Sequence, residues 1–287
     1  MADEDIQLSN KEFDDVRDLI YKIAGISLGD AKRVLVVSRL SKLVKAKGLA
    51  SFSAYISFLQ GRATKEEKQT FVNALTTNLT RFYREDHHFD HLIDYVGKLI
   101  ARPNQPKSPN GKSRLRIWSA GCSTGQEPYT IAMALLGKYP QLKSWDFKIL
   151  GTDVDTNVVA TSAIGSYAVG DLEGLSAKQA GVFERPTADT IRVPALYRNL
   201  MTFKPLNLME SWPIKGPFDA IFCRNVTIYF DKETQTKVFQ RFSELLGEGA
   251  YLYIGHSENM RAEALGYALE GKTVYRRLAE QSKRNVA

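Results

Sequence analysis

Apolar residues recur at helical spacing through the first quarter of the chain, from residue 10 to residue 77. In the first segment they lie three or four positions apart, at Phe13, Val16, Leu19, Ile20 and Ile23, as on one face of a helix. Glycines between residues 25 and 29 interrupt this pattern. A second helix is expected from residue 30 to residue 48, with inward-facing Val34, Val37, Leu40 and Leu43 or Val44. The pattern predicts an all-helical N-terminal domain over residues 1–81, with a linker that begins near residue 74.

Short apolar runs alternate with helical patterns in the rest of the chain. A helix is predicted over residues 89–101, and strands over residues 115–120, 147–152, 218–223, 250–255 and 273–276. Alternating strands and helices are typical of an α/β domain whose mostly parallel sheet is covered on both faces. Such a sheet binds its ligand at the carboxyl ends of its strands. We therefore predict an α/β domain over residues 82–287.

Two further β-favouring runs lie between the second and third predicted strands. They cover residues 191–193 and 200–204, and a short polar stretch separates them. Runs of this kind favour a β-hairpin. We expect a small antiparallel β insertion, as a subdomain of about residues 165–206.

A strand, a glycine turn and a helix follow one another between residues 115 and 136. Gly121 and Gly125 permit a tight turn, and Pro128 suits the first turn of a helix. This turn has three interpretations: an ordinary strand-to-helix connection, a hydrolase nucleophile elbow around Ser123, or a cradle for a nucleotide-type cofactor. The elbow is disfavoured because only helices precede its strand. Its triad would need Ser123, Asp219 and His256.

Polar residues occur where several predicted strands end. Residues at such positions are Gly121, Glu127, Asp153, Asn207 and Asn225. Because the carboxyl ends of parallel strands meet at one edge of a sheet, we expect these residues to line one site. An acidic residue after the second strand of a nucleotide-binding domain accepts hydrogen bonds from ribose hydroxyls. Asp153 holds that position, somewhat further from the glycine turn than is usual.

Composition limits the protein's class and its partners. The 287 residues are 44% hydrophobic and 25% charged, with a formal net charge of +7, which favours an acidic partner without identifying it. Nucleic acid, anionic lipid and an acidic protein surface all remain open. Cys122 and Cys223 have no metal or disulfide spacing and are expected to be small core residues in a reducing compartment. With an acidic start at residues 1–5 and no apolar run of membrane length, a cytoplasmic protein without membrane insertion is expected.

Positive charge is concentrated in the helical domain. Residues 31–65 contain no Asp or Glu, but they include Lys32, Arg33, Arg39, Lys42, Lys45, Lys47 and Arg62. This basic face is either a solvated surface or a docking site for an acidic helix. The histidines His87, His88 and His91 are expected to form a surface cluster at a helix start. No metal site is predicted.

Five segments together resemble the bacterial chemotaxis receptor methyltransferases of the CheR family. They are Asn-Leu-Thr-Arg-Phe-Tyr-Arg at 78–84, Ser-Ala-Gly-Cys-Ser-Thr-Gly-Gln-Glu-Pro-Tyr at 119–129, Gly-Thr-Asp at 151–153, Phe-Asp-Ala-Ile-Phe-Cys-Arg-Asn-Val-Thr-Ile-Tyr-Phe-Asp at 218–231, and Gly-His-Ser-Glu-Asn at 255–259. The resemblance covers nearly the whole chain. It implies a Rossmann-like domain that uses S-adenosylmethionine to methylate glutamate carboxylates of chemoreceptors. The products would be glutamyl methyl esters, formed during adaptation in chemotaxis.

The resemblance also implies roles for single residues. Cofactor contacts are implied at Asn78, Thr80, Arg84, Glu127, Asp153, Asn207, Leu208, Arg224 and Asn225, and Gly121 joins them through the glycine turn. Asp153 would bind the ribose, and Glu127 with Arg84 would hold the methionine end. Tyr229 would face the transferred methyl group, so that Arg84 and Tyr229 are the catalytic candidates. The chain departs from the family at Leu79, where Glu is more common, and at Tyr83, where Phe is.

The resemblance further predicts partners. Receptor methylation helices are rich in glutamate, so the expected docking residues are Lys32, Arg33, Arg39, Lys42 and Lys45. The loop of residues 184–190 is short and has no glycine, so we expect an enzyme that does not need a tethering peptide from the receptor's C-terminus. A cytoplasmic monomer recruited to chemoreceptor arrays is expected, with regulatory adaptor proteins left open. The alternatives are a non-catalytic S-adenosylmethionine-binding signalling module and, less favoured, a nucleic-acid methyltransferase.

Overall fold

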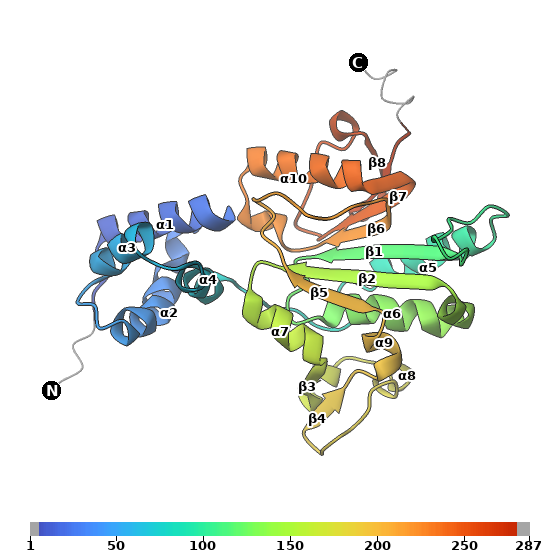
Figure 1. The fold of residues 1–287 in the computed structure, drawn as a ribbon, viewed down its shortest axis with the longest axis horizontal. Helices are drawn as coiled ribbons and strands as arrows, with labels where there is room; N and C mark the ends of the chain where they lie inside the picture. The colour runs from blue at the N-terminus through green and yellow to red at the C-terminus, as the bar shows by residue number, and fades with distance from the viewer. Residues whose placement is uncertain (1–5, 280–287) are drawn as a thin grey trace.

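A computed structural model describes residues 6–279 of the chain (Figure 1). The acidic start at residues 1–5 lies outside the described residues. The N-terminal part is helical, as predicted, with α1 (Asn10–Ala24), the 3₁₀ turn η1 (Asp30–Lys32), α2 (Arg33–Ala46), α3 (Phe52–Gly61) and α4 (Lys65–Leu75). Ser9 caps α1 in a capping box with Glu12, and Gly25 ends it in the left-handed conformation at φ +70°.

The helical domain has its own hydrophobic core. Phe13, Val16, Leu19 and Ile20 of α1 are buried as predicted. In α2 the buried residues are Val36, Leu40 and Val44, spaced four apart, and the expected inward position of Val34 is wrong because its side chain is 79% exposed. The helix starts only at Arg33, after a 3₁₀ turn, so its buried stripe runs through residues 36, 40 and 44.

The second part of the chain is a seven-stranded mixed sheet. Its strand order is β5-β2-β1-β6-β7-β9-β8, and the five strands from β5 to β7 are mutually parallel. The strands are β1 (Arg114–Ala120), β2 (Asp146–Asp153), β5 (Met201–Pro205), β6 (Phe218–Cys223), β7 (Leu246–Ile254), β8 (Tyr267–Gly271) and β9 (Val274–Arg277). The predicted α/β class is confirmed. Strand β8, which exposes most of its residues, was not predicted.

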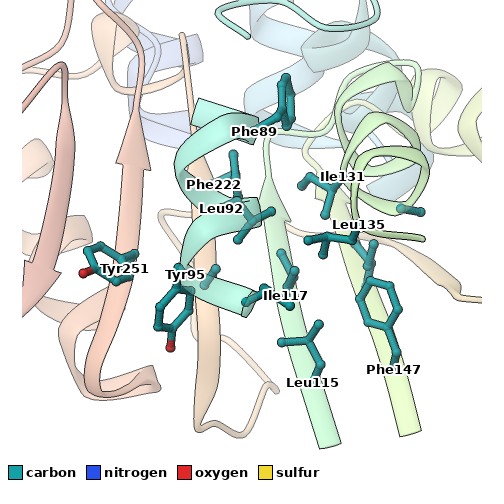
Figure 2. Close-up of a cluster of buried hydrophobic side chains, with 14 of the residues drawn as sticks. Phe89, Leu92, Tyr95, Leu115, Ile117, Ile131, Leu135, Phe147, Phe222 and Tyr251 are labelled. Atoms are coloured by element: carbon teal, nitrogen blue, oxygen red, sulfur yellow. The ribbon is translucent and has the colours of Figure 1, made fainter. Parts of the chain in front are cut away.

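Helices cover both faces of the sheet, and side chains of one strand alternate between them. Leu115 and Ile117 face α5 (His87–Ile100) and α6 (Gln126–Lys138), where Figure 2 shows Leu92 and Leu135 packed over the strands. Trp118 belongs to the core on the opposite face, under α10 (Lys232–Leu245). The remaining helices are α7 (Thr156–Ile164), α8 (Ala177–Ala180) and α9 (Ala195–Arg198), with 3₁₀ turns η2 (Pro140–Ser144), η3 (Val169–Leu172), η4 (Thr227–Tyr229) and η5 (Glu263–Leu265).

The predicted antiparallel insertion needs a correction. Its two strands are β3 (Ser166–Ala168) and β4 (Thr190–Arg192), which pair with each other. The run at residues 200–204 is not part of it, because β5 joins the main sheet and pairs in parallel with β2. Helix α9 lies between β4 and β5 and separates the two runs. A short β-favouring run carries no information on its partner, so sequence reasoning paired it with its neighbour in the chain.

Polar contacts join the helical domain to the sheet domain. Asp155, at the N-cap of α7, accepts hydrogen bonds from the Thr76 hydroxyl at 2.7 Å and from the Asn78 amide at 2.8 Å. Asn73 of α4 donates to the Thr156 hydroxyl at 2.8 Å. Because Asp155 is buried, these bonds satisfy a carboxylate that water does not reach. Within residues 6–279, no helix is long and apolar enough to cross a membrane.

Replacing Asp155 should therefore destabilise the protein by more than the loss of a helix cap. We expect Asp155→Ala to lower the free energy of unfolding by about 2–4 kcal/mol, since it removes the cap and leaves two donors without their charged acceptor. Ser51→Ala removes the cap of α3, and this control should cost only about 1 kcal/mol. Urea denaturation measures both. Equal losses in the two variants would show that the interdomain bonds add nothing to stability.

Candidate active site

One cleft opens at the carboxyl edge of the sheet, beneath the helical domain. It holds about 1290 Å³ of empty space, including its opening to solvent. All the residues predicted to bind the cofactor, and Tyr229, line it: Asn78, Thr80, Arg84, Gly121, Glu127, Asp153, Asn207, Leu208, Arg224, Asn225 and Tyr229. Gly121, Glu127, Asp153, Asn207 and Asn225, which were predicted to lie at strand ends, therefore meet in one place.

The glycine turn after β1 forms the floor of the cleft. Gly121 has φ +82°, and a Cβ atom there would overlap the side chain of Val226. Gly125 has φ +97°, and its Cβ would come within 2.7 Å of Cβ of Ser162. Both positions therefore require glycine. The turn leads directly into α6, whose first turn contains Pro128. Gly121, Cys122 and Ser123 of the turn and Glu127 in the first turn of α6 line the cleft, so a ligand there lies beside a helix N-terminus.

Asp153 ends β2 at the floor of the cleft. Its carboxylate accepts hydrogen bonds from the backbone N–H groups of Ser123 at 2.8 Å and Asp155 at 3.0 Å. Burial raises the pKa of Asp153 to about 6, against an ordinary 3.8. The side chain is therefore mostly ionised at neutral pH and is held rigidly, with lone pairs left to accept bonds from ligand hydroxyls.

Arg224 is buried at the end of β6 between two carboxylates. It forms ion pairs with Glu127 at 3.2 Å and with Glu85 at 3.3 Å, and its guanidinium carbon lies 5.5 Å from the centre of the Phe89 ring. It also donates to the backbone carbonyl of Arg84. Burial raises the pKa of Glu127, although the charge of Arg224 opposes that shift. Glu85 was not among the predicted site residues.

Glu85 extends this network to the surface. It accepts a hydrogen bond from the exposed His256 ring at 2.8 Å. Burial acts to raise the pKa of Glu85, but His256 and the charge of Arg224 outweigh it and lower that pKa to about 2. His88 is fully buried beside Glu85, at 3.6 Å, and burial lowers its pKa to about 3. The expected surface position of His88 is therefore wrong.

The hydrolase triad does not form. The hydroxyl of Ser123 donates to the carbonyl of Asn78 at 3.0 Å, and His256 pairs with Glu85. Asp219 lies near the start of β6, where it accepts the backbone N–H of Arg116 at 2.7 Å. The nucleophile-elbow interpretation is wrong, since its serine and its acid lie at opposite ends of the sheet. Within residues 6–279 no three His, Cys, Asp or Glu side chains are grouped as metal ligands, and both cysteines are buried.

Glu258 holds the loop that carries Tyr229. This buried carboxylate follows β7 and accepts backbone N–H bonds from Asn225 at 2.8 Å, Val226 at 3.0 Å and Thr227 at 2.7 Å. Glu258 belongs to the segment of residues 255–259 that resembles the family, but the sequence predicts no function for it. An acidic residue three positions beyond a buried strand, in a Gly-His-Ser-Glu run, is the signal that was available.

The helical domain supplies one wall of the cleft. Residues 26–29 line it, and the backbone N–H of Ser27 donates to the carbonyl of Tyr229 at 2.8 Å. The Asn207 amide donates to the carbonyl of Ile23 at 2.7 Å. Sequence reasoning treated the glycine-bounded segment of residues 25–29 as a break between helices. Only the packing of the two domains reveals that it belongs to the site.

The wall formed by residues 78–85 is irregular and firmly held. Tyr83 and Glu85 are left-handed, at φ +55° and +54°, as are Ser123 and Asn225 elsewhere in the site. The guanidinium of Arg84 donates to the carbonyl of Leu79 at 2.9 Å.

The predicted docking residues are not equivalent. Lys32 is exposed and lines the cleft, and Lys42 and Lys45 are exposed on α2. Arg33 instead donates to the Leu8 carbonyl and lies over the Phe13 ring. Arg39 donates to the carbonyls of Ala74 and Thr76. Arg33 and Arg39 thus bond to backbone carbonyls of the helical domain and its linker, and the three lysines are exposed.

Two family models match the chain. The family described as "CheR methyltransferase, all-alpha domain" matches residues 11–76, and "CheR methyltransferase, SAM binding domain" matches residues 78–275. The boundary between the two matches falls in the linker predicted near residue 74.

Curated relatives match over nearly their full length. A "Probable chemotaxis protein methyltransferase" of Rhizobium etli is 44% identical over 86% of this chain and 91% of its own. The "Chemotaxis protein methyltransferase" of Salmonella typhimurium is 40% identical over 94% of this chain and 91% of its own, and that of Escherichia coli is 40% identical over 95% and 92%. With these matches and the cleft at the sheet's carboxyl edge, the chain belongs to the CheR family of S-adenosylmethionine-dependent methyltransferases.

Proposed function

We propose that this protein is a protein-glutamate O-methyltransferase. It transfers the methyl group of S-adenosylmethionine to glutamate carboxylates in the cytoplasmic helices of chemoreceptors, and glutamyl methyl esters are the product. The observation that carries this proposal is the convergence of Glu127, Asp153, Arg224 and Tyr229 in one cleft of a CheR-family chain. Relatives named as methyltransferases over nearly their whole length favour this catalytic interpretation over the non-catalytic binding module.

The residues of the cleft fit the cofactor. Gly121, Cys122 and Ser123 of the turn line the cleft, so the ligand can lie against the turn. Asp153 offers a buried carboxylate to the ribose hydroxyls, and Glu127 a carboxylate to the methionine ammonium group. Asn78, Thr80, Asn207, Leu208 and Asn225 complete the lining. The bound cofactor supplies a methyl group on a sulfonium, which is the reactive chemistry of the site.

The chain's own task is to orient the substrate and exclude water. A glutamate side chain is ionised at neutral pH, because its reference pKa is about 4.3, so no general base is needed. Tyr229 aligns the incoming carboxylate, and its backbone is fixed by Ser27 on one side and by the Glu258-bound loop on the other. Arg84 serves the methionine end first, since an arginine pressed on the nucleophile would reduce its reactivity. Positioning of this kind can supply much of the rate enhancement.

We assign the docking of the receptor to the helical domain, residues 1–81, and catalysis to residues 82–287. Exposed Lys32, Lys42 and Lys45 attract the glutamate-rich helix and act mainly on encounter. The enzyme works as a monomer in the cytoplasm at chemoreceptor arrays, independently of a tethering peptide. Regulatory adaptor proteins are a further class of partner.

Methyl transfer to a receptor tests the reaction directly. Labelled S-adenosylmethionine should place label on isolated chemoreceptor cytoplasmic fragments, and mild alkali should release it as methanol, because carboxyl esters are base-labile. Asp153→Ala should lose both the label and the affinity for S-adenosylhomocysteine. Alkali-stable label would reject ester formation, and unchanged affinity in Asp153→Ala would reject the ribose assignment.

Cofactor affinity should depend on pH through Asp153. The ionised carboxylate accepts ribose hydroxyls, and its pKa in the free enzyme is about 6. Affinity for S-adenosylhomocysteine should therefore be constant above about pH 7 and fall about tenfold per unit below about pH 6. Asp153→Asn should bind more weakly and show no such fall. Isothermal titration at several pH values measures this, and a profile of the same shape in the Asn variant would assign the titration to another group.

Ionisation of Asp153 should also affect stability. Burial raises the pKa of Asp153 above the ordinary 3.8, so the folded protein holds this proton more tightly than the unfolded chain does. The resulting contribution to the free energy of unfolding is complete below about pH 4 and is lost as pH rises through about 6.

Charge reversal on the exposed lysines should weaken receptor encounter. We expect Lys32→Glu with Lys42→Glu to raise the receptor KM about tenfold at low salt, and much less at about 1 M salt, where charges are screened. Lys138→Glu with Lys143→Glu is the matched control, since both lysines are exposed, Lys138 as the last residue of α6 and Lys143 in η2. Similar changes in the two double variants would mean that net charge acts without a docking site.

A further inference from the structure

Leu79 is conspicuous because it is apolar, exposed and part of the cleft. Among residues 6–279 it is the most exposed large hydrophobic side chain, at 83%. It also lines the cleft, so it lies at the mouth rather than on the floor. A single exposed leucine elsewhere on a surface needs no explanation. At this position, any substrate that enters the cleft must pass it.

The backbone of Leu79 is anchored on both sides. Its own carbonyl accepts the Arg84 guanidinium at 2.9 Å. The preceding Asn78 donates its amide to Asp155 at 2.8 Å, and its carbonyl accepts the Ser123 hydroxyl at 3.0 Å. The leucine is therefore presented from a fixed backbone. Covering this leucine therefore costs the rotamer freedom of one side chain but little backbone freedom.

Several cations share the cleft with this leucine. Lys32, Arg81 and Arg84 line the same cleft, and Lys32 and Arg81 are exposed. A mouth with several cations and one projecting apolar side chain is complementary to an acidic helix that also carries apolar residues. An anionic partner without apolar side chains would gain no binding energy from the leucine.

We propose that Leu79 is a specificity contact for the receptor helix, an inference that rests on the proposed function. When the target glutamate enters the cleft, the residues three or four positions away on its helix lie about 5–6 Å from it, between Cβ atoms. Leu79 packs against an apolar side chain at one of these positions. It thereby favours glutamates with an apolar neighbour one turn away over glutamates flanked by charge.

Leu79→Ser and Leu79→Asp test this contact. Each should raise the Kd and KM for a receptor cytoplasmic fragment, by about tenfold for Ser and by more for Asp. Affinity for S-adenosylhomocysteine and kcat at saturating receptor should not change. Leu269→Ser is the control, because Leu269 is 58% exposed on β8, at the far edge of the sheet.

A double-mutant cycle identifies the partner side chain. Serine at the apolar position one turn from the target glutamate should weaken methylation by the unaltered enzyme but cause little further loss with Leu79→Ser. Unchanged receptor affinity in both Leu79 variants would overturn the proposal. So would an equal loss of S-adenosylhomocysteine affinity, since the leucine would then cover the cofactor. If the unaltered enzyme labels no receptor fragment, the proposed substrate itself is wrong. The proposed Leu79 contact is then wrong as well.

Discussion

The arrangement of the site depends on one buried cation, the guanidinium of Arg224. It links the end of β6 to Glu127 on α6, to Glu85 and the Arg84 carbonyl just before α5, and to the Phe89 ring on α5. Withdrawing such a charge from water is unfavourable unless its partners are in place, and removing one partner commonly costs about 3–5 kcal/mol. Segments from three parts of the chain are therefore kept together by the requirement to neutralise one side chain.

The sequence predicts the site residues at strand ends better than the residues that hold them in place. Asp153 and Arg224 could be placed at one edge because each ends an apolar run, and parallel strands have a common direction. Glu85 and Ser27 could not be placed, since their partners lie far away in the chain and no local period marks them. The pairing of β5 failed for the same reason, because a five-residue run does not specify its neighbour. Val34 was misplaced by the unforeseen 3₁₀ turn before α2.

The two family models match separate stretches of the sequence, but hydrogen bonds join the two domains. Asp155 caps a helix of the catalytic domain, yet Thr76 and Asn78 from the linker satisfy its remaining oxygen. The carbonyl of Tyr229 likewise accepts from Ser27 in the helical domain. A receptor helix that docks on α2 thus contacts a domain whose own backbone supports the catalytic loop. In the proposed function, docking and alignment of the substrate thus depend on the same interdomain contact.

The left-handed residues around the cleft have a consequence for the evolution of the enzyme. Tyr83, Glu85, Ser123 and Asn225 all carry side chains in a backbone region that favours glycine, at a cost of about 1 kcal/mol or more each. Glycine would relieve that strain, but at Glu85, Ser123 and Asn225 it would delete side chains that build the site. Selection for thermal stability and selection for turnover therefore oppose each other at these three positions, and a more heat-resistant variant must gain its stability elsewhere in the fold.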